Sequence, residues 1–360
     1  MRITPIIILV CSRFAKALTT NSILNVPRPS QRRFIVTQPS FSNGRISVRS
    51  NSFNNSDREN GTASIHDYIS LLRPITTLQA VGGFLVGRLV ILRHHRIPGD
   101  PPTFFRDVPS LVLASLSIYL SYGAGMAMND CADASVDMQH NKKQHRSIAS
   151  GRISTRDGWI FCFVLSCLSL IVAKLATPSG GTRFLLWNTL NLVLMASYAF
   201  GMQKLFLIKN FICGWLAVSP LVGASFLGAT DVLDNAVIAE LYQLAAIGFP
   251  LQVSREILKD IEDVDVDRNE KQTLPLVIGE KLCQRIAYGL VALINVALTV
   301  LPHYWRMFAS SPPVYAISVA MGVPMCIKAS TLALIPGQKL LKKSIFVLLA
   351  GMIGGLLLQS

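Results

Sequence analysis

The chain has 360 residues, of which 51% are hydrophobic and only 15% are charged. Soluble domains usually carry about 25% charged residues, so this composition and a mean hydropathy of +0.44 exclude an ordinary soluble protein and indicate burial in a lipid bilayer. The net charge of +14 does not indicate a nucleic-acid partner. Eight basic residues precede residue 57, and the rest of the chain has 26 Lys and Arg against 20 Asp and Glu. That remainder has no compact basic patch.

The N-terminal stretch differs in composition from the rest of the chain. Residues 1–56 contain no Asp or Glu, and their basic residues lie among many Ser and Thr, as in organellar transit peptides. We therefore expect residues 1–60 to be a transit peptide or disordered extension and residues 61–360 to form one membrane domain. A plastid membrane is the first expected location and a mitochondrial membrane the second. A basic arm that is retained in the mature protein is the alternative.

Long apolar segments recur from about residue 68 to the C-terminus. A membrane-spanning helix needs roughly 20 apolar residues, and connections with Pro and Gly separate nine segments that approach this length. The sequence thus predicts an all-α fold, a multi-pass membrane bundle of about nine transmembrane helices around a central cavity. The expected helices are 68–93, 109–130, 157–176, 182–200, 211–229, 237–258, 284–302, 313–335 and 343–358.

The basic residues of the loops predict an orientation. If nine helices alternate in direction, the loops after the second, fourth, sixth and eighth helices share one face and carry fifteen Lys and Arg, whereas the opposite loops carry about five. Basic loops face the cytoplasm, or the stroma or matrix of an organelle. Two acidic clusters, described next, lie on this basic face.

The first acidic cluster follows the second predicted helix, in residues 129–137 (NDCADASVD). Asn129, Asp133 and Asp137 stand at positions i, i+4 and i+8, which fall within roughly 80° of one helix face. We therefore expect three oxygen ligands to point into one space.

The second acidic cluster follows the sixth predicted helix, in residues 256–267 (EILKDIEDVDVD). Asp260, Asp263 and Asp267 stand at i, i+3 and i+7, within roughly 60° of one face, and Glu256 joins them one turn earlier. The two clusters are thus predicted to be similar sets of carboxylates at the same membrane face.

Such clusters need a partner, because stacked like charges destabilise a helix and carboxylates at a membrane are costly unless they are neutralised. Mg²⁺ is the expected partner: it prefers oxygen ligands and is usually held by one or two carboxylates together with phosphate oxygens. The sequence therefore predicts Mg²⁺ and a bound diphosphate. The alternative is that each cluster is only a solvated polar helix end. Ca²⁺ binding would need a loop pattern that neither cluster has.

These clusters resemble the paired motifs of the UbiA-type superfamily of membrane prenyltransferases. That superfamily carries N-D-x-x-D-x-x-x-D after its second helix and another Asp-rich motif after its sixth. Residues 129–137 contain the first motif complete, and residues 255–263, followed by Thr273 to Pro275, are most similar to the digeranylgeranylglyceryl phosphate synthase branch.

Two shorter motifs extend the resemblance to about residues 68–358. Residues 72–74 (LRP) resemble the Arg-Pro motif before the first helix of the superfamily, and residues 146–151 (RSIASG) resemble its R-P-x-x-S-G segment. Ser147 stands where the superfamily usually has Pro, a change that we expect to affect loop stiffness more than chemistry.

The resemblance implies Mg²⁺-assisted transfer of a polyprenyl group from its diphosphate to an acceptor. It implies four catalytic carboxylates, Asp133, Asp137, Asp260 and Asp263. The implied Mg²⁺ ligands are Asn129, Asp133, Asp137, Asp260, Asp263 and Asp267. The candidates for substrate binding are Arg73, Asn129, Lys142, Arg146, Tyr198, Lys204 and Lys209. For the basic residues among them the alternative is orientation in the membrane, and for the tyrosine it is an interfacial aromatic position.

Two other classes of protein and several acceptors stay open. A secondary transporter also surrounds acidic residues with many helices, but it would hold them near the middle of the membrane. A CDP-alcohol phosphotransferase would need a D-x-x-D-G-x-x-A-R run, which residues 133–137 do not begin. The prenyl group is expected to be of the geranylgeranyl or phytyl class. The acceptor is a lipid, a quinone precursor or a tetrapyrrole, and the residues do not distinguish among these.

Overall fold

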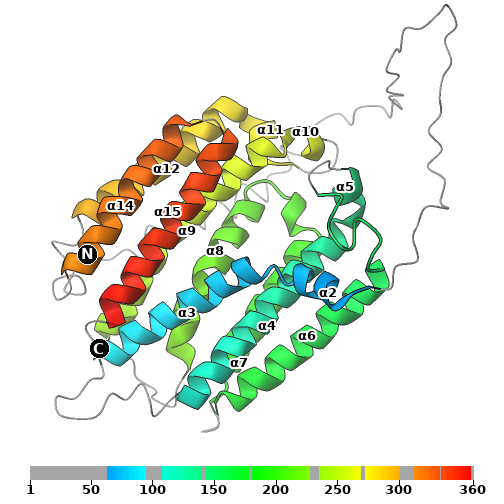
Figure 1. The fold of residues 1–360 in the computed structure, drawn as a ribbon, viewed down its shortest axis with the longest axis horizontal. Coiled ribbons are helices and arrows are strands. Elements are labelled where there is room, and N and C mark those ends of the chain that lie inside the picture. Colours follow the sequence, from blue (N-terminus) through cyan, green and yellow to red (C-terminus); the bar gives the residue numbers. More distant parts are fainter. Residues whose placement is uncertain are drawn as a thin grey trace, which may run out of the picture. The chain divides into compact units, whose positions relative to one another are not determined.

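A computed structural model describes residues 63–94, 108–139, 143–177, 181–227, 235–268, 272–300, 312–332 and 334–357. All regular elements in these ranges are helices (Figure 1), which confirms the all-α prediction. The predicted extension of residues 1–60 and the candidate Lys142 lie outside the described residues.

Each of the nine predicted segments overlaps a long helix in the described part of the chain. These helices are α3 (Pro74–His94), α4 (Val108–Ala132), α6 (Thr155–Leu175), α7 (Arg183–Phe200), α8 (Ile208–Gly223), α9 (Asn235–Glu262), α12 (Glu280–Val300), α14 (Pro312–Thr331) and α15 (Leu334–Leu357). Five spans among the described residues are long and apolar enough to cross a membrane: α3, α4, α6, α9, and α8 together with the short helix η5 (Ala224–Phe226).

The first predicted helix, 68–93, is wrong at its start, because the structure divides it into α2 (Ile65–Leu71) and α3. Pro74 begins α3, a position that Pro favours, and Pro disfavours a helical conformation in the residue before it. Arg73 accordingly lies between the two helices with a positive φ of 46°. The break places Arg73 between two helices rather than inside one, and its side chain donates to Asp130 near the end of α4.

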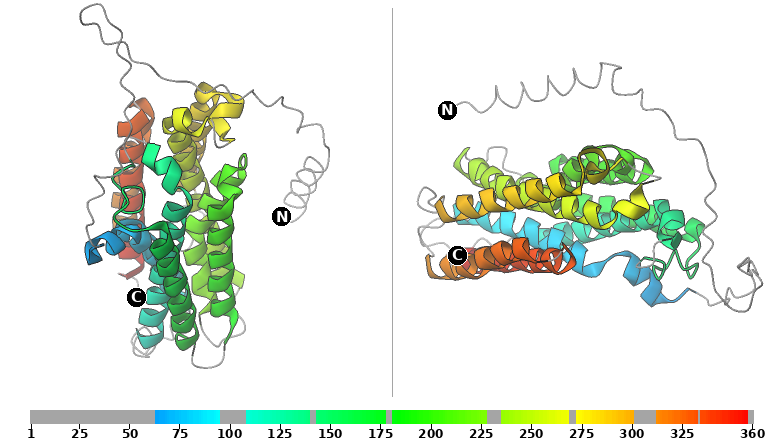
Figure 2. Two further views of the ribbon diagram at one scale, coloured as in Figure 1. Left: turned by 90° about the vertical axis from the view of Figure 1, so that its right-hand side faces the viewer. Right: turned by 90° about the horizontal axis from the view of Figure 1, so that it is seen from above.

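The long helices pack against one another in a bundle. α4 packs against α3, α6 and α7, and α8 packs against α3 and α9. α12 packs against α9 and α14, and α15 packs against α14 and α3 (Figures 1 and 2). The largest apolar core joins α3, α7 and their neighbours through Phe84, Phe184 and Trp187. The predicted central cavity stays a prediction.

The surface of the bundle suits a hydrocarbon environment. Phe163 of α6 and Leu190 of α7 are 69% and 68% exposed. Transfer of such apolar side chains out of water lowers the free energy. Polar residues of the same helices point inward instead: Asn188 of α7 is fully buried and donates hydrogen bonds to Ser117 of α4 and Ser169 of α6. Interhelical hydrogen bonds of this kind satisfy polar groups within a membrane.

Short helices continue from the long ones at one end of the bundle. They are α5 (Ala134–Gln139), η4 (Met202–Lys204), α10 (Val264–Asp267) and α11 (Leu274–Ile278). α5 follows α4, and α10 follows α9, so each acidic cluster lies where a long helix gives way to a short one.

Candidate functional site

The first acidic cluster lies at the junction of α4 and α5. Asp133 occupies the turn between these helices, yet its backbone N–H donates to the Asn129 carbonyl at 2.9 Å and the Asp137 N–H donates to the Asp133 carbonyl at 2.8 Å. The helical hydrogen-bond pattern therefore continues across the break and keeps the predicted i, i+4, i+8 spacing. Both aspartates are buried, and Asn129 Nδ2 donates to Asp133 Oδ2 at 3.3 Å.

Asp130, which was not among the predicted ligands, connects this cluster to two arginines. Its buried Oδ1 accepts hydrogen bonds from Arg73 and, at 2.9 Å, from Arg146 Nη1. The same Nη1 donates to Asp137 Oδ2 at 2.6 Å. Arg146 thus bridges two buried carboxylates. The helical spacing that selected Asn129 places Asp130 on another face, so that argument omitted Asp130. The N-D motif, which contains Asp130, was the one signal in the sequence that could have indicated its role.

The second acidic cluster lies at the end of α9. Asp260 is fully buried, and Asp263 is buried in the turn that follows the helix. Lys209 Nζ donates to Asp260 Oδ1 at 2.5 Å, and Asn210 Nδ2 donates to Asp260 Oδ2 at 3.0 Å. Lys209, predicted to contact phosphate, is itself 6% exposed and is held by the carboxylate. The amide of Asn210 was missed, because sequence alone does not reveal which residues of another helix reach Asp260.

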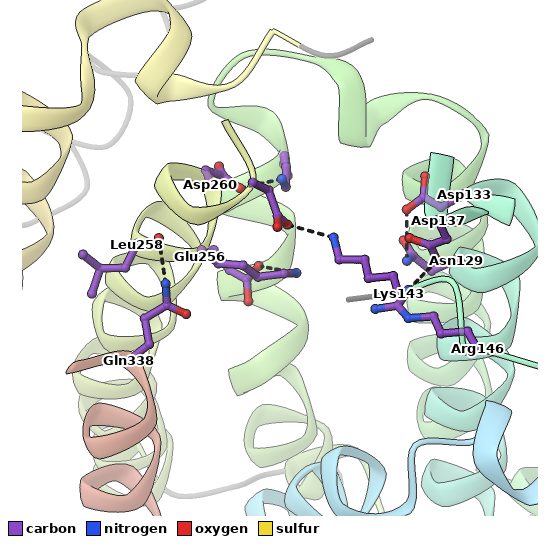
Figure 3. Close-up of polar contacts among 12 residues, drawn as sticks. Asn129, Asp133, Asp137, Lys143, Arg146, Glu256, Leu258, Asp260 and Gln338 are labelled. Carbon is purple, nitrogen blue, oxygen red and sulfur yellow. Dashed lines mark hydrogen bonds and ion pairs between the residues drawn. The ribbon is translucent and has the colours of Figure 1, made fainter. Parts of the chain in front are cut away.

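A lysine joins the two clusters. Lys143, in the segment after α5, donates from Nζ to Asp263 Oδ2 at 2.9 Å. Figure 3 shows Asp133 and Asp137 on one side and Asp260 on the other, with Lys143 extending between them and Arg146 beside the first cluster. Both clusters therefore lie at one end of the bundle and face a common space, as the sequence predicted.

One turn before Asp260, Glu256 adds another buried carboxylate to the second side (Figure 3). It accepts hydrogen bonds from Gln252, Arg255 and Lys259 at 3.0, 3.0 and 3.4 Å. Two basic groups, Arg255 and Lys259, therefore contact the carboxylate of Glu256.

Three further candidates differ in their surroundings. The side chain of Lys204 is exposed, and the adjacent Gln203 is buried and donates from Nε2 to Asp133 Oδ1 at 2.9 Å. Tyr198 is half-buried in the last turn of α7 and hydrogen-bonds with Cys213 of α8. Asp267 ends α10, and its side chain lies outside the described part of the chain.

Burial and neighbouring positive charges act on the pKa of Asp137 in opposite directions. Burial raises the pKa of Asp137, and the nearby charges of Arg146 and Lys143 oppose that rise. A carboxyl group in this position gains from any further cation that approaches it, since a nearby positive charge favours its ionised form.

The carboxylates fit Mg²⁺ in a shared mode of binding. Among the described residues, no three His, Cys, Asp or Glu side chains come close enough to hold an ion by themselves. Mg²⁺ commonly takes one or two carboxylates and completes its octahedron with water and substrate phosphates. Buried oxygen donors on two facing sides supply that kind of partial ligand set.

The short helix α2 fixes the position of Arg73. Asp67 of α2 accepts a hydrogen bond from Arg152 Nε at 2.7 Å and forms a capping box with Ser64. Ser147 reaches the same place, with its Oγ 2.8 Å from Ser70 Oγ. The serine that replaces the usual Pro thus anchors α2 with a hydrogen bond, a role beyond the loop stiffness that we expected.

Asp67→Asn is expected to remove a pH-dependent part of the stability. Hydrogen bonds from Arg152 and Ser64 lower the pKa of Asp67 from 3.8 to about 2, so the ionised group stabilises the fold above pH 3.8, and that contribution is lost as the pH falls toward 2. In thermal unfolding of the detergent-solubilised protein, the difference between wild type and variant should shrink over this range. Arg152→Gln should reproduce the effect, and a pH-independent difference would contradict the assignment.

Comparison with known proteins places this chain in a family. The sequence profile of the UbiA prenyltransferase family matches residues 98–350. The digeranylgeranylglyceryl phosphate synthase of Methanosarcina mazei is 32% identical over 263 residues, which cover 72% of this chain and 86% of that protein.

Solved structures share the fold. A structure of digeranylgeranylglyceryl phosphate synthase in membranes is similar with a TM-score of 0.58 at 22% identity, over 81% of this chain and 98% of that one. A UbiA homolog from Archaeoglobus fulgidus bound to GPP and Mg²⁺ is similar with a TM-score of 0.53 at 17% identity, over 79% of this chain and 99% of that one.

Proposed function

Because the chain belongs to the UbiA prenyltransferase family and is a multi-pass membrane prenyltransferase, we propose that it transfers a polyprenyl group of the geranylgeranyl or phytyl class from its diphosphate to a membrane-associated acceptor. The pair of facing carboxylate clusters, with Lys143 between them and Arg146 bound to the first, carries this proposal (Figure 3). Carboxylates alone would repel a diphosphate. Carboxylates interleaved with basic side chains can hold one together with Mg²⁺.

The chemistry follows from the charge that the diphosphate gains. The bond between the first prenyl carbon and a diphosphate oxygen breaks, a bond to the acceptor forms, and the acceptor loses a proton. Lys143 and Arg146 have more N–H donors than their carboxylate bonds use, so they can donate to the departing oxygens. Donors already oriented in a buried site stabilise developing charge with little reorganisation. Mg²⁺, held by Asp133 and Asp137 on one side and Asp260 and Asp263 on the other, would supply further positive charge to the diphosphate.

The relatives favour an acceptor with a phosphate group. Their name, digeranylgeranylglyceryl phosphate synthase, indicates a prenylated glyceryl phosphate, and Arg73 beside Arg146 presents a second guanidinium at Asp130. Arginine suits phosphate because its planar fork donates two parallel hydrogen bonds. We infer that the nine long helices cross the membrane, and that this membrane is organellar if residues 1–60 act as a transit peptide.

Labelled geranylgeranyl diphosphate tests the proposal directly. The purified protein should release diphosphate and form a labelled lipid when it is given Mg²⁺ and the correct member of a panel: geranylgeranylglyceryl phosphate, homogentisate, dihydroxynaphthoate, 4-hydroxybenzoate or chlorophyllide. Phytyl diphosphate serves as the second donor. EDTA should stop the reaction. Failure of every donor and acceptor pair, or transfer that continues undiminished in EDTA, would overturn the proposal.

A further inference from the structure

A single short stretch of chain reaches both acidic clusters. Residues 203–210, here called the connector, link the end of α7 to the first turn of α8 through η4. Its first residue contacts the first cluster, and its last two contact the second.

At the N-terminal end of the connector, a buried amide holds Asp133. Gln203 is 3% exposed, and its Nε2 donates to Asp133 Oδ1 at 2.9 Å, while Asn129 donates to the other oxygen of the same carboxylate. These two contacts, one on each carboxylate oxygen, therefore fix the plane of the Asp133 carboxylate.

At the C-terminal end, a second buried amide holds Asp260 in the same way. Asn210 is 1% exposed and donates from Nδ2 to Asp260 Oδ2 at 3.0 Å. Lys209 donates to the other oxygen. Each carboxylate of this pair thus has one oxygen bound by the connector's amide and the other by a different donor.

The backbone of the connector is itself constrained. Leu207, which precedes α8, has φ 61°, in the left-handed region that residues other than Gly seldom occupy. Its side chain and that of Phe206 pack against the apolar core around Ile257 and Leu274, and the Lys204 carbonyl accepts a hydrogen bond from the Gln272 N–H at 3.2 Å. Backbone strain of this kind persists where surrounding contacts fix it, often at functional sites.

From this arrangement we propose that the connector sets the relative positions of the two carboxylate clusters, with Gln203 and Asn210 as the positioning residues for Asp133 and Asp260. The inference rests on the proposed function, because the clusters matter as ligands only if a Mg²⁺-diphosphate binds between them. Neither amide is required to touch the substrate. Each acts by orienting a carboxylate, as the outer partners of metal ligands do.

The test uses binding without turnover. Gln203→Met and Asn210→Leu remove each donor while keeping nearly the same volume. In the purified full-length protein, titration calorimetry with inorganic pyrophosphate at fixed Mg²⁺ should show binding weakened about 10- to 100-fold, the range known for outer partners of metal ligands. The Mg²⁺ concentration needed for half-maximal transfer should rise in parallel. If either variant fails to assemble, Gln203→Asn and Asn210→Ser, which retain shorter polar groups, are expected to give smaller shifts in the same direction.

A matched control separates positioning from general stability. Gln338 of α15 makes a comparable amide bond, donating from Nε2 to the Leu258 carbonyl of α9 at 2.8 Å (Figure 3). Gln338→Met should lower the melting temperature without weakening pyrophosphate binding. If the connector variants lower the melting temperature but bind pyrophosphate like wild type, the positioning role is wrong and the proposed function stands. If the wild type binds no Mg²⁺-pyrophosphate, both fail.

Discussion

Asp260→Asn is expected to lower prenyl transfer about 10²- to 10³-fold, the loss typical of removing one preorganised electrostatic group from an active site, while the protein still inserts into membranes. Asp260 is fully buried at the end of α9 and lies between Lys209 and Asn210. The asparagine has the same shape but no charge to attract Mg²⁺. Single-turnover transfer with saturating donor and Mg²⁺ measures the effect.

The neutral isostere is preferable to alanine at this position. Both substitutions break the buried ion pair with Lys209, at a cost of about 3–5 kcal/mol. Asp260→Asn keeps the volume and an amide oxygen that can accept from Lys209, whereas Asp260→Ala also leaves a cavity and no acceptor. Lost activity could then reflect lost folding. Asp265→Asn is the matched control, because that carboxylate lies five residues later with a side chain that is 92% exposed. Near-normal transfer by the Asp260→Asn variant, or an equal loss in the control, would remove Asp260 from the proposed site.

Sequence patterns predicted the helices and acidic residues of this site better than the residues that hydrogen-bond to the carboxylates. Apolar length located the nine long helices, and helical spacing aligned Asn129, Asp133 and Asp137 on one face even though the helix breaks at Asp133. Both signals are local. A pattern with a period of 3.6 residues reports which face of a helix a residue occupies, whatever that face meets.

The partners of the carboxylates depend on contacts between distant segments, which no local pattern reports. Lys204 was predicted to contact phosphate from its charge, but the connector turns it outward and turns Gln203 toward Asp133. Asn210 resembled any other polar residue at a helix start. The start of the first helix was misplaced for a different reason. The prediction counted the apolar residues Leu71 and Leu72 as part of the helix, whereas Pro74 was the signal that marked where α3 begins.

Arg146→Met is expected to destabilise the protein and to abolish most of its transfer activity. Arg146 Nη1 donates to both Asp130 and Asp137, whose side chains are 5% and 4% exposed. Without the guanidinium, these two carboxylates lose a shared partner in a buried place. Because the Arg146 side chain is itself 24% exposed, the loss should fall below the about 3–5 kcal/mol that a fully buried pair would cost. Thermal unfolding in detergent with EDTA measures it without any contribution from bound metal.

A second substitution distinguishes electrostatic from packing effects. Asp137→Asn removes one of the two carboxylates, so Arg146→Met should cost less stability in that background than in wild type, and the difference is the coupling free energy of the pair. Arg146→Lys should fall between wild type and the Met variant, because an ammonium restores the charge but not the planar donor fork. Equal losses in both backgrounds would mean that Arg146 and Asp137 have no coupling free energy, and that Arg146 stabilises this end of the bundle without the Asp137 carboxylate, through Asp130 or through packing.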